Sequence, residues 1–467
     1  MPMAFLKFKY LNMRKFKKYF KGKKVTVMGL GLLGRGVGDA AFLAECGAEL
    51  TITDLKTKEQ LKDSITKLKK FNPEGKQASY GAGNIKYILG KHRLEDFRDR
   101  DLILKAAGVP IDSIYIKEAE KNKIPVKMSA SLFVELSNLP MIGVTGTRGK
   151  STVTHLIARI LESAGPRYAK GSGEASKRVI LGGNVRGVSN LQLLKQARNK
   201  DFAVFELDSW QLQGFGEAKI SPHISVFTNF MQDHLNYYKN NPEQYFTDKS
   251  YIYKFQRPSD VLILGPGMKN KIKSVKSEVV KASIKNIPKT WKILLAGKHN
   301  LENIACALEV ARFLKIKEEI IRASVESFSP IEGRLQMVKK IHGVSIYNDN
   351  NSTTADAAIA SLNSFSQKII LIMGGMDKGP EVNNLNKILS QKTKKIFLTP
   401  GSGSDRIKNE KADIEKVVNL EDAVNKSLEF AQKGDVILFS PGFASFNMFK
   451  NEYDRGDQFM KIVNNLK

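Results

Sequence analysis

Short runs of apolar and β-branched residues recur along this chain, and most of them end in Gly, Asp or Asn. Such runs begin near residues 25, 49, 101, 141, 202, 224, 260, 344, 368, 395 and 435, with helix-forming stretches between them. Strands that alternate with crossover helices predict an α/β fold with parallel sheets throughout. In such sheets ligands bind beyond the carboxyl ends of the strands, where these polar and glycine residues lie.

The chain length predicts several domains. A chain of 467 residues exceeds the ~100 to 200 residues of a usual domain, which suggests about three. The sequence has no repeat of solenoid period and no low-complexity linker. We therefore place the domains by the positions of motifs, at residues 1–128, 129–330 and 331–467.

Apolar run lengths and cysteine usage predict a cytoplasmic protein without integral membrane association. No apolar run approaches the ~18 to 20 residues of a membrane helix, and a signal-peptide pattern is missing at the N-terminus. Cys46 and Cys306 are too few and too distant for a disulfide framework or a zinc site, which favours buried, reduced thiols.

The charge of the chain is strongly basic. Its 75 Lys and Arg against 47 Asp and Glu give a net charge of +28, which fits a nucleic-acid partner, an anionic membrane surface or polyanionic small substrates. The densest basic segment is LKFKYLNMRKFKKYFKGKK, residues 6–24, which lacks the sustained periodicity of a strong amphipathic anchor. We interpret it as a solvated basic arm, leave a membrane role open, and expect no nucleic-acid partner.

The strongest local signal is a strand, a glycine-rich turn and a helix in the segment MIGVTGTRGKSTVTHLIARILESAG. Gly146 and Gly149 would let the backbone approach phosphate, Lys150 would reach the outer phosphates, and Ser151 could hold magnesium. The spacing departs from the common phosphate-loop pattern, because the first glycine is Gly143, one residue early. The segment predicts an ATP site, and the alternative is a capped helix with a chance GKS.

A second turn, Gly29-x-Gly31-x-x-Gly34, follows the first predicted strand, and Asp54 ends the next one. Alone, this spacing fits a nicotinamide or flavin enzyme, and it fits a nucleotide diphosphate as well. A chain with both this turn and an ATP-type loop predicts a nucleotide-linked substrate together with ATP.

Three further residues are candidates for the site. Glu206 ends a predicted strand, where it would ligate magnesium or cap the following helix. His234 follows another strand beside Asp233, and a ligand and a structural histidine are both open readings. The local sequence of Lys249 marks it only as a surface lysine.

Together these segments resemble the Mur ligases. The resemblance rests on motifs in a fixed order: GVTGTRGKST, GGNVR, ELDSWQL, TNFMQDHLNYY, GKHNLENIACAL, YNDNNSTTADAAIAS, IMGGMDKG and SPGFASFNMFKNEYDRG. It implies an N-terminal Rossmann-like domain for the UDP end of a substrate, a central P-loop ATPase domain with a mostly parallel sheet, and a C-terminal Rossmann-like domain for an amino acid.

The resemblance also assigns residues to ligands. It implies ATP binding by Gly146, Thr147, Gly149, Lys150, Ser151, Thr152, Asn300, Asn303, Arg334 and Asp349. Within this set, Asn300 and Asn303, together with His299, resemble the family's adenine-side motif, and Arg334 and Asp349 resemble a nucleotide clasp contributed from the third domain. It implies two magnesium ions held by Ser151, Glu206, His234 and a carbamylated Lys249, and catalytic roles for Lys150, Glu206, His234 and Lys249. It implies binding of the UDP substrate by Gly31, Leu32, Leu33, Asp54 and Asn184, and of the acceptor amino acid by Thr353, Lys378 and Ser445.

Within the family, the motifs are most similar to members that add D-glutamate to UDP-N-acetylmuramoyl-L-alanine in peptidoglycan precursor synthesis. The implied enzyme is a monomer that joins the two substrates through an acyl phosphate, with its third domain closing over the site on hinges near residues 128 and 330. A folate polyglutamate synthase is the nearest rival, but it would lack the first ~128 residues. A nicotinamide oxidoreductase would leave the phosphate loop unexplained.

Four positions depart from the family pattern. Asn351 stands where a lysine is expected, Glu452 stands where an aromatic residue is expected, and Leu33 lacks a hydroxyl that could bind phosphate. The segment from Glu332 to Arg334 reads Glu-Gly-Arg in place of Pro-His-Arg. These departures leave open another acceptor, such as L-glutamate, or an inactive nucleotide-binding scaffold, although Lys150, Glu206, His234 and Lys249 are all retained.

Overall fold

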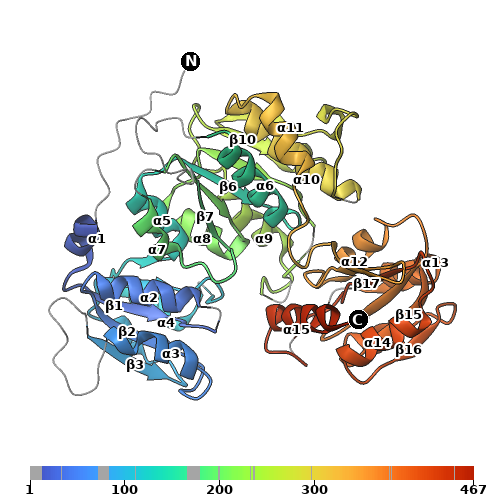
Figure 1. Ribbon diagram of the computed structural model, residues 1–467. Helices are drawn as coiled ribbons and strands as arrows, with labels where there is room; N and C mark the ends of the chain where they lie inside the picture. Colours follow the sequence, from blue (N-terminus) through green and yellow to red (C-terminus); the bar gives the residue numbers. More distant parts are fainter. Residues whose placement is uncertain are drawn as a thin grey trace. The chain divides into compact units, whose positions relative to one another are not determined.

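The computed structural model describes residues 13–32, 34–71, 84–110, 112–165, 179–197, 200–231, 233–234, 237–295, 297–377, 379, 381–445 and 448–466. The chain forms two compact units. The first comprises Met1–Phe230, Glu243–Ala282 and Cys306–Ile320, and the second Met231–Pro242, Ser283–Ala305 and Ile321–Lys467. The first unit holds two sheets and the second holds one (Figure 1).

The first sheet has five parallel strands in the order β3-β2-β1-β4-β5. Its strands are β1 (Lys24–Met28), β2 (Glu49–Asp54), β3 (Ile85–Leu89), β4 (Leu102–Lys105) and β5 (Val126–Lys127). Its helices are α1 (Met13–Phe20), α2 (Arg35–Glu45), α3 (Lys62–Leu68) and α4 (Ile114–Lys121), with short 3-10 turns η1 (Lys69–Phe71) and η2 (Leu94–Phe97). Alternate residues serve opposite faces, since Leu104 packs in the core beneath α2 and Ile103 packs in the core beneath α4.

The basic arm is more ordered than the sequence suggested. Residues 6–12 lie outside the described residues, but α1 is a helix whose Phe16 and Phe20 are buried. Both rings meet Phe42 of α2, at centroid distances of 5.7 and 6.2 Å. The expectation of a solvated arm is therefore wrong for this helix, because two aromatic residues one turn apart fix it to the domain while Lys15 and Lys18 remain exposed.

The second sheet has six parallel strands in the order β11-β10-β9-β6-β8-β7. Its strands are β6 (Met141–Thr145), β7 (Val179–Gly183), β8 (Phe202–Glu206), β9 (Ile224–Phe227), β10 (Val261–Leu264) and β11 (Glu278–Lys281). The helices in this part of the chain are α5 (Ser129–Ser137), α6 (Lys150–Ser163), α7 (Asn190–Leu193), α8 (Ser209–Ala218), α9 (Pro242–Ser250), α10 (Lys298–Phe313) and α11 (Glu318–Glu326). The 3-10 turns are η3 (Leu194–Gln196), η4 (Lys269–Lys271) and η5 (Ile284–Asn286).

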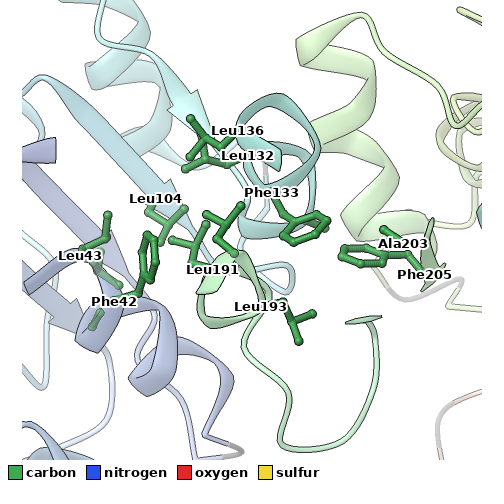
Figure 2. Close-up of a cluster of buried hydrophobic side chains, with 14 of the residues drawn as sticks. Phe42, Leu43, Leu104, Leu132, Phe133, Leu136, Leu191, Leu193, Ala203 and Phe205 are labelled. Atoms are coloured by element: carbon green, nitrogen blue, oxygen red, sulfur yellow. The ribbon is translucent and has the colours of Figure 1, made fainter. Parts of the chain in front are cut away.

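One hydrophobic core joins the first two sheets. Figure 2 shows side chains from α2, β4, α5, α7 and β8 pointing toward one another, among them Phe42, Leu104, Phe133, Leu191 and Phe205. The rings of Phe133 and Phe205 lie 4.9 Å apart. The boundary placed at residue 128, and a hinge there, stay predictions, and any motion at that point would have to separate this shared core.

The third sheet has six strands in the order β12-β13-β17-β14-β15-β16. Its strands are β12 (Gln336–Ile341), β13 (Val344–Asn348), β14 (Ile369–Gly374), β15 (Thr393–Thr399), β16 (Ile414–Lys416) and β17 (Val436–Phe439). Its helices are α12 (Ala355–Leu362), α13 (Asn383–Lys392), α14 (Leu420–Phe430) and α15 (Glu452–Asn465), with one 3-10 turn, η6 (Ser404–Arg406). Along β14, Leu371 packs in the core with α12 and α13, whereas Ile372 packs in the core with α14 and α15.

The predicted α/β fold class is confirmed, with one correction to strand direction. Parallel pairing throughout is wrong at β12, which runs antiparallel to β13. Only His342 and Gly343 join these two strands, and both have positive φ, 48° and 83°. A two-residue turn of this kind makes a hairpin, because a parallel connection needs a long crossover.

The described part of the chain contains no helix with the length and apolar character that crossing a membrane requires.

Candidate active site

The predicted phosphate loop connects β6 to α6. Gly146 has φ 141° and Gly149 has φ 83°, so both adopt conformations that favour glycine. A Cβ on Gly146 would come within 2.0 Å of Thr228 Oγ1. Gly149 caps α6 without a side chain, which leaves the positive end of this 14-residue helix facing the loop.

Two residues that follow β9 hold the loop in shape. Asn229 accepts hydrogen bonds from the backbone N–H groups of Thr147, at 3.0 Å to its carbonyl, and of Arg148, at 2.8 Å to its side-chain oxygen. Thr228 Oγ1 donates to the Arg148 carbonyl at 2.6 Å. Sequence reasoning missed this pair, although polar residues directly after a strand next to the loop strand were the available signal.

Two lysines converge on one carbonyl of the loop. Lys150 Nζ donates to the Gly146 oxygen at 3.1 Å, and Lys249 Nζ donates to the same oxygen at 2.9 Å. Lys249 is 1% exposed and its amine lies 4.8 Å from the centroid of the Tyr245 ring. The local reading of Lys249 as a surface lysine is therefore wrong, because α9 brings it against the loop from 103 residues away.

Glu206 and Asn184 lie at the carboxyl edge of the same sheet. The strand β8 pairs with β6, with Glu206 opposite Val144, so the predicted neighbourhood of Glu206 and the phosphate loop is confirmed. Glu206 is 5% exposed, and its carbonyl accepts the N–H of Asn184 at 2.7 Å. Ser151 and Thr152, in the first turn of α6, are buried as well.

The glycine turn of the first sheet follows β1. Gly29, Gly31 and Gly34 all have positive φ. Asp54 is buried, and its two carboxylate oxygens accept the N–H groups of Gly31 at 3.0 Å and Lys56 at 2.9 Å. Asp54 thus fastens the turn, and its predicted contact with a substrate stays a prediction.

Leu32 and Leu33 are the two leucines of this glycine turn. Leu32 is exposed, and Leu33 lies outside the described residues. Their predicted contacts with the UDP substrate stay predictions.

The predicted adenine-side residues lie in the second unit, at the start of α10. Asn300 and Asn303 are buried, and Asn303 Nδ2 donates to Asn300 Oδ1 at 3.2 Å. Burial lowers the pKa of His299, which favours a neutral ring.

His234, a predicted magnesium ligand, has φ 54°, and its backbone N–H donates to the Asp233 carboxylate at 2.8 Å.

The predicted clasp is assembled around Asp349. Its carboxylate accepts the Leu335 N–H at 3.1 Å, Ser361 Oγ at 2.5 Å and Ser440 Oγ at 2.9 Å. Burial raises the pKa of Asp349 to about 6, against the hydrogen bonds and the nearby Arg334, which lower it. Arg334 thus lies close enough to Asp349 to act on its charge, and the predicted contact of both residues with ATP stays a prediction.

Two of the three predicted acceptor residues, Thr353 and Ser445, lie at the carboxyl ends of strands of the third sheet. The strands β13 and β14 both pair with β17, which brings the loops carrying Thr353 and Ser445 together. Gly442 N–H donates to the Ser352 carbonyl at 2.8 Å. The hydroxyls of Ser352 and Ser445 are buried without a hydrogen-bond partner, and Lys378 lies outside the described residues.

Arg455 is a central residue of this edge that sequence reasoning did not single out. It is 2% exposed, and its guanidinium donates to Asn350 Oδ1, the Asn350 carbonyl and the Phe443 carbonyl at 2.8 to 3.0 Å. Burial lowers the pKa of Arg455 to about 10, and the charge of Glu452 raises it. Its place in the quoted EYDRG motif was the available signal.

Of the departures from the family pattern, Asn351 has a structural role for its side chain, whereas Glu452 is contacted through its backbone. Asn351 Nδ2 donates to the Glu332 carbonyl at 3.1 Å, and its N–H donates to the Gly333 carbonyl at 3.0 Å. Asn351 therefore fastens the Glu-Gly-Arg segment to the loop after β13. The Glu452 carbonyl accepts a hydrogen bond from Asn350 Nδ2 at 2.7 Å.

These residues fit a nucleoside triphosphate and magnesium. The loop excludes a Cβ at Gly146, as a phosphate cradle does, and Lys150 and the start of α6 supply positive charge. Glu206 and Ser151 offer the oxygen ligands that magnesium prefers. Among the described residues, no group of three or more His, Cys, Asp or Glu side chains is arranged for a metal.

Comparison with known proteins agrees with this geometry. Residues 144–289 match the model of the Mur ligase middle domain, and residues 333–443 match that of the Mur ligase glutamate ligase domain. A UDP-N-acetylmuramoylalanine–D-glutamate ligase from Roseiflexus sp. (strain RS-1) is 32% identical over 95% of this chain and 98% of its own. A protein of the same name from Borreliella afzelii (strain PKo) is 34% identical over 96% of this chain and 98% of its own.

The chain belongs to the Mur ligase family. The family resemblance inferred from the ordered motifs is thereby confirmed, and the chain is an ATP-dependent ligase that forms amide bonds. Among solved structures, this Mur ligase is similar to a UDP-N-acetylmuramate–alanine ligase from Thermotoga maritima, with TM-score 0.58 and 18% identity over 95% of this chain and all of the other. That similarity supports the three-domain α/β fold.

Proposed function

We propose that this Mur ligase joins D-glutamate to the L-alanine carboxylate of UDP-N-acetylmuramoyl-L-alanine and converts ATP to ADP and phosphate. The observation that carries the proposal is the carboxyl edge of the central sheet, where the phosphate loop, Glu206 and Lys249 lie together and Asn184 is bonded to Glu206. The two near-full-length relatives carry the name of this reaction.

The first step joins two anions, so the chain's charge placement decides its rate. The alanine carboxylate oxygen attacks the γ-phosphorus, the bond to the β-phosphate oxygen breaks, and an acyl phosphate and ADP result. Lys150 and the start of α6 lie where they offset repulsion between carboxylate and triphosphate. Ser151, Glu206 and His234 are the side chains proposed to hold magnesium, which neutralises charge on the transferring phosphoryl group when bound.

Lys249 is proposed to carry a carbamate. Its amine attacks carbon dioxide, an N–C bond forms and a proton is released, which turns a cation into a carboxylate-like ligand. Burial beside the phosphate loop supports this proposal, because an unmodified ammonium there would share the Gly146 carbonyl with Lys150. The carbamate nitrogen keeps one hydrogen, so the bond to Gly146 can persist.

The second step takes place on the acceptor. Its amino group attacks the acyl carbon, phosphate leaves, and an amide bond forms. Thr353, Lys378 and Ser445 are proposed to bind the acceptor carboxylates, and the buried, unpartnered hydroxyl of Ser445 supports this role. We also propose that the protein acts as a monomer and has no nucleic-acid partner.

Product analysis tests the acceptor assignment. The chain is incubated with ATP, magnesium and UDP-N-acetylmuramoyl-L-alanine, and D-glutamate, L-glutamate and other amino acids are compared by mass spectrometry of the product. We expect a product whose mass has grown by one glutamyl residue with D-glutamate alone. A product with L-glutamate in its place would overturn the acceptor, and ATP binding without any product would favour an inactive scaffold.

A further inference from the structure

Arg35 lies between the glycine turn that follows β1 and the carboxyl edge of the central sheet. It is the first residue of α2 and directly follows Gly34 of the glycine turn. Its Nη1 donates to Asn184 Oδ1 at 2.6 Å, across 149 residues of sequence. Asn184 in turn donates its N–H to the Glu206 carbonyl. A continuous set of hydrogen bonds therefore runs from the glycine turn to the edge of the central sheet.

The Arg35 guanidinium has capacity for another partner. Its Nε is buried and lacks a hydrogen-bond partner. Among the described residues, no carboxylate forms an ion pair with Arg35. Asp39, one turn further along α2, directs one carboxylate oxygen to Ser189 Oγ and the Leu191 N–H instead. An anion at the turn would satisfy donors that the protein itself leaves unused.

The position of Arg35 is electrostatically unfavourable without a ligand. The first turn of a helix is its positive end, so a cation there is disfavoured. A partly buried guanidinium without an ion pair adds a desolvation cost. Both costs fall when a phosphate binds at this place, because the helix start and the guanidinium then act on the same anion.

The glycine turn has room for such an anion. Gly31 and Gly34 have φ values of 67° and 84°, and a Cβ on either would meet no atom within 4 Å. The Asp54 carboxylate already shapes the turn through two backbone N–H groups. Leu33 has no hydroxyl to offer. Arg35 is thus the side chain at this turn that combines positive charge with an unused donor.

We propose that Arg35 binds the diphosphate of the UDP-linked substrate and, through its hydrogen bond to Asn184, links the substrate turn to the edge of the ATP-binding sheet. The proposal rests on the proposed function, since it names a further binding residue for the same substrate. A guanidinium suits this role because it can donate two parallel hydrogen bonds to phosphate oxygens.

The test compares two probes that differ only in phosphate. Calorimetry with the full chain, saturated with ADP and magnesium, measures the affinities of UDP and of uridine for the wild type, Arg35→Gln and Arg35→Lys. We expect Arg35→Gln to weaken UDP binding at least about tenfold with uridine binding unchanged, and Arg35→Lys to lie between, because one charged, phosphate-directed contact is lost. Arg98→Gln, which removes an exposed cation paired with Glu118 in the same domain, is the control for net charge.

The outcomes separate the two proposals. Equal losses for UDP and uridine, or no loss for either, would show that Arg35 is a structural residue and overturn this inference while the proposed function stands. Failure of the wild type to bind either UDP or UDP-N-acetylmuramoyl-L-alanine would instead remove the proposed function, and the inference with it. ADP binding by each variant shows that the fold is retained.

Discussion

The carboxyl ends of the strands in two sheets of this Mur ligase carry different kinds of polar group. At the edge of the central sheet, the phosphate loop is shaped by backbone geometry, and two lysines meet on the Gly146 carbonyl. At the edge of the third sheet, the buried polar groups are mostly neutral, with hydroxyls of Ser352 and Ser445 that lack a partner. The geometry of the first edge suits a polyanion such as a triphosphate. At the second edge recognition is left to side chains, and three of the four departures from the family pattern lie in this part of the chain.

The largest loss of turnover is expected from a substitution in the phosphate loop at the edge of the central sheet. Lys150→Ala should lower turnover at least about 1,000-fold, because the transferring phosphoryl group loses a cation placed at the loop. Phosphate release under saturating substrates measures this, and Arg159→Ala, an exposed cation on the same helix, is the matched control. A loss below tenfold for Lys150→Ala would mean that the loop is not where ATP reacts.

The second prediction concerns Lys249. Lys249→Arg should lower turnover about 100-fold, because arginine keeps the positive charge of an unmodified lysine and cannot form the carbamate that would ligate metal. Removal of dissolved carbon dioxide and bicarbonate should lower wild-type activity, and added bicarbonate should restore it. Lys254→Arg, on an exposed lysine five residues on, should behave like the wild type. Activity that is indifferent to bicarbonate would refute the carbamate.

The third prediction concerns the buried Asp349 carboxyl, which follows β13 of the third sheet. The pKa of Asp349 is raised from 3.8 to about 6, so its stabilising contribution is present below about pH 4 and is lost as pH rises through 6. A rise of two units corresponds to about 3 kcal/mol. The stability of the wild type relative to Asp349→Asn should therefore fall between pH 4 and pH 7, as measured by urea unfolding.

The control for this pH effect is Asp405→Asn, which replaces an exposed carboxylate in the same unit and should show no such trend. If the difference between wild type and Asp349→Asn did not change with pH, the pKa of Asp349 would have to be the same in the folded and unfolded states, which would contradict the rise caused by burial.

The smallest effect is expected from a pair of serines. Ser445→Ala should leave stability unchanged, because its hydroxyl has no partner, but should raise the acceptor KM about tenfold through one lost hydrogen bond to a charged group. Ser440→Ala should destabilise the protein, since that hydroxyl donates to Asp349 at 2.9 Å. Thermal unfolding and steady-state kinetics separate the two. The same loss of stability in both variants would contradict the contrast.

The sequence predicted the central strands of each sheet and missed the outer ones. The eleven predicted runs all form strands, whereas β3, β5, β7, β11, β12 and β16 were not predicted, and each of these lies at the edge of its sheet. Central parallel strands are covered on both faces and read as continuous apolar runs. Of the outer strands, β11 is largely exposed and β16 is only partly buried, so their hydrophobic signal is weak.

The site shows a similar division. Gly146, Lys150 and Ser151 were predictable because the loop is continuous in sequence and its chemistry dictates the residue types. The local sequence did not mark Lys249, which only the family resemblance singled out, and Arg455 was not predicted at all. Both make contacts across about 100 residues with backbone carbonyls, which leave no mark in the local sequence. Arg35 belongs with them, since its partner Asn184 is distant in the chain.

The most direct test of the central claim follows an oxygen atom. UDP-N-acetylmuramoyl-L-alanine labelled with oxygen-18 in its alanine carboxylate is incubated with the chain, ATP, magnesium and D-glutamate, and the released phosphate is analysed by mass spectrometry. An acyl phosphate requires that one carboxylate oxygen leave with phosphorus, so the account predicts one labelled oxygen in each phosphate released during ligation. Phosphate without the label, formed alongside the amide product, would contradict it.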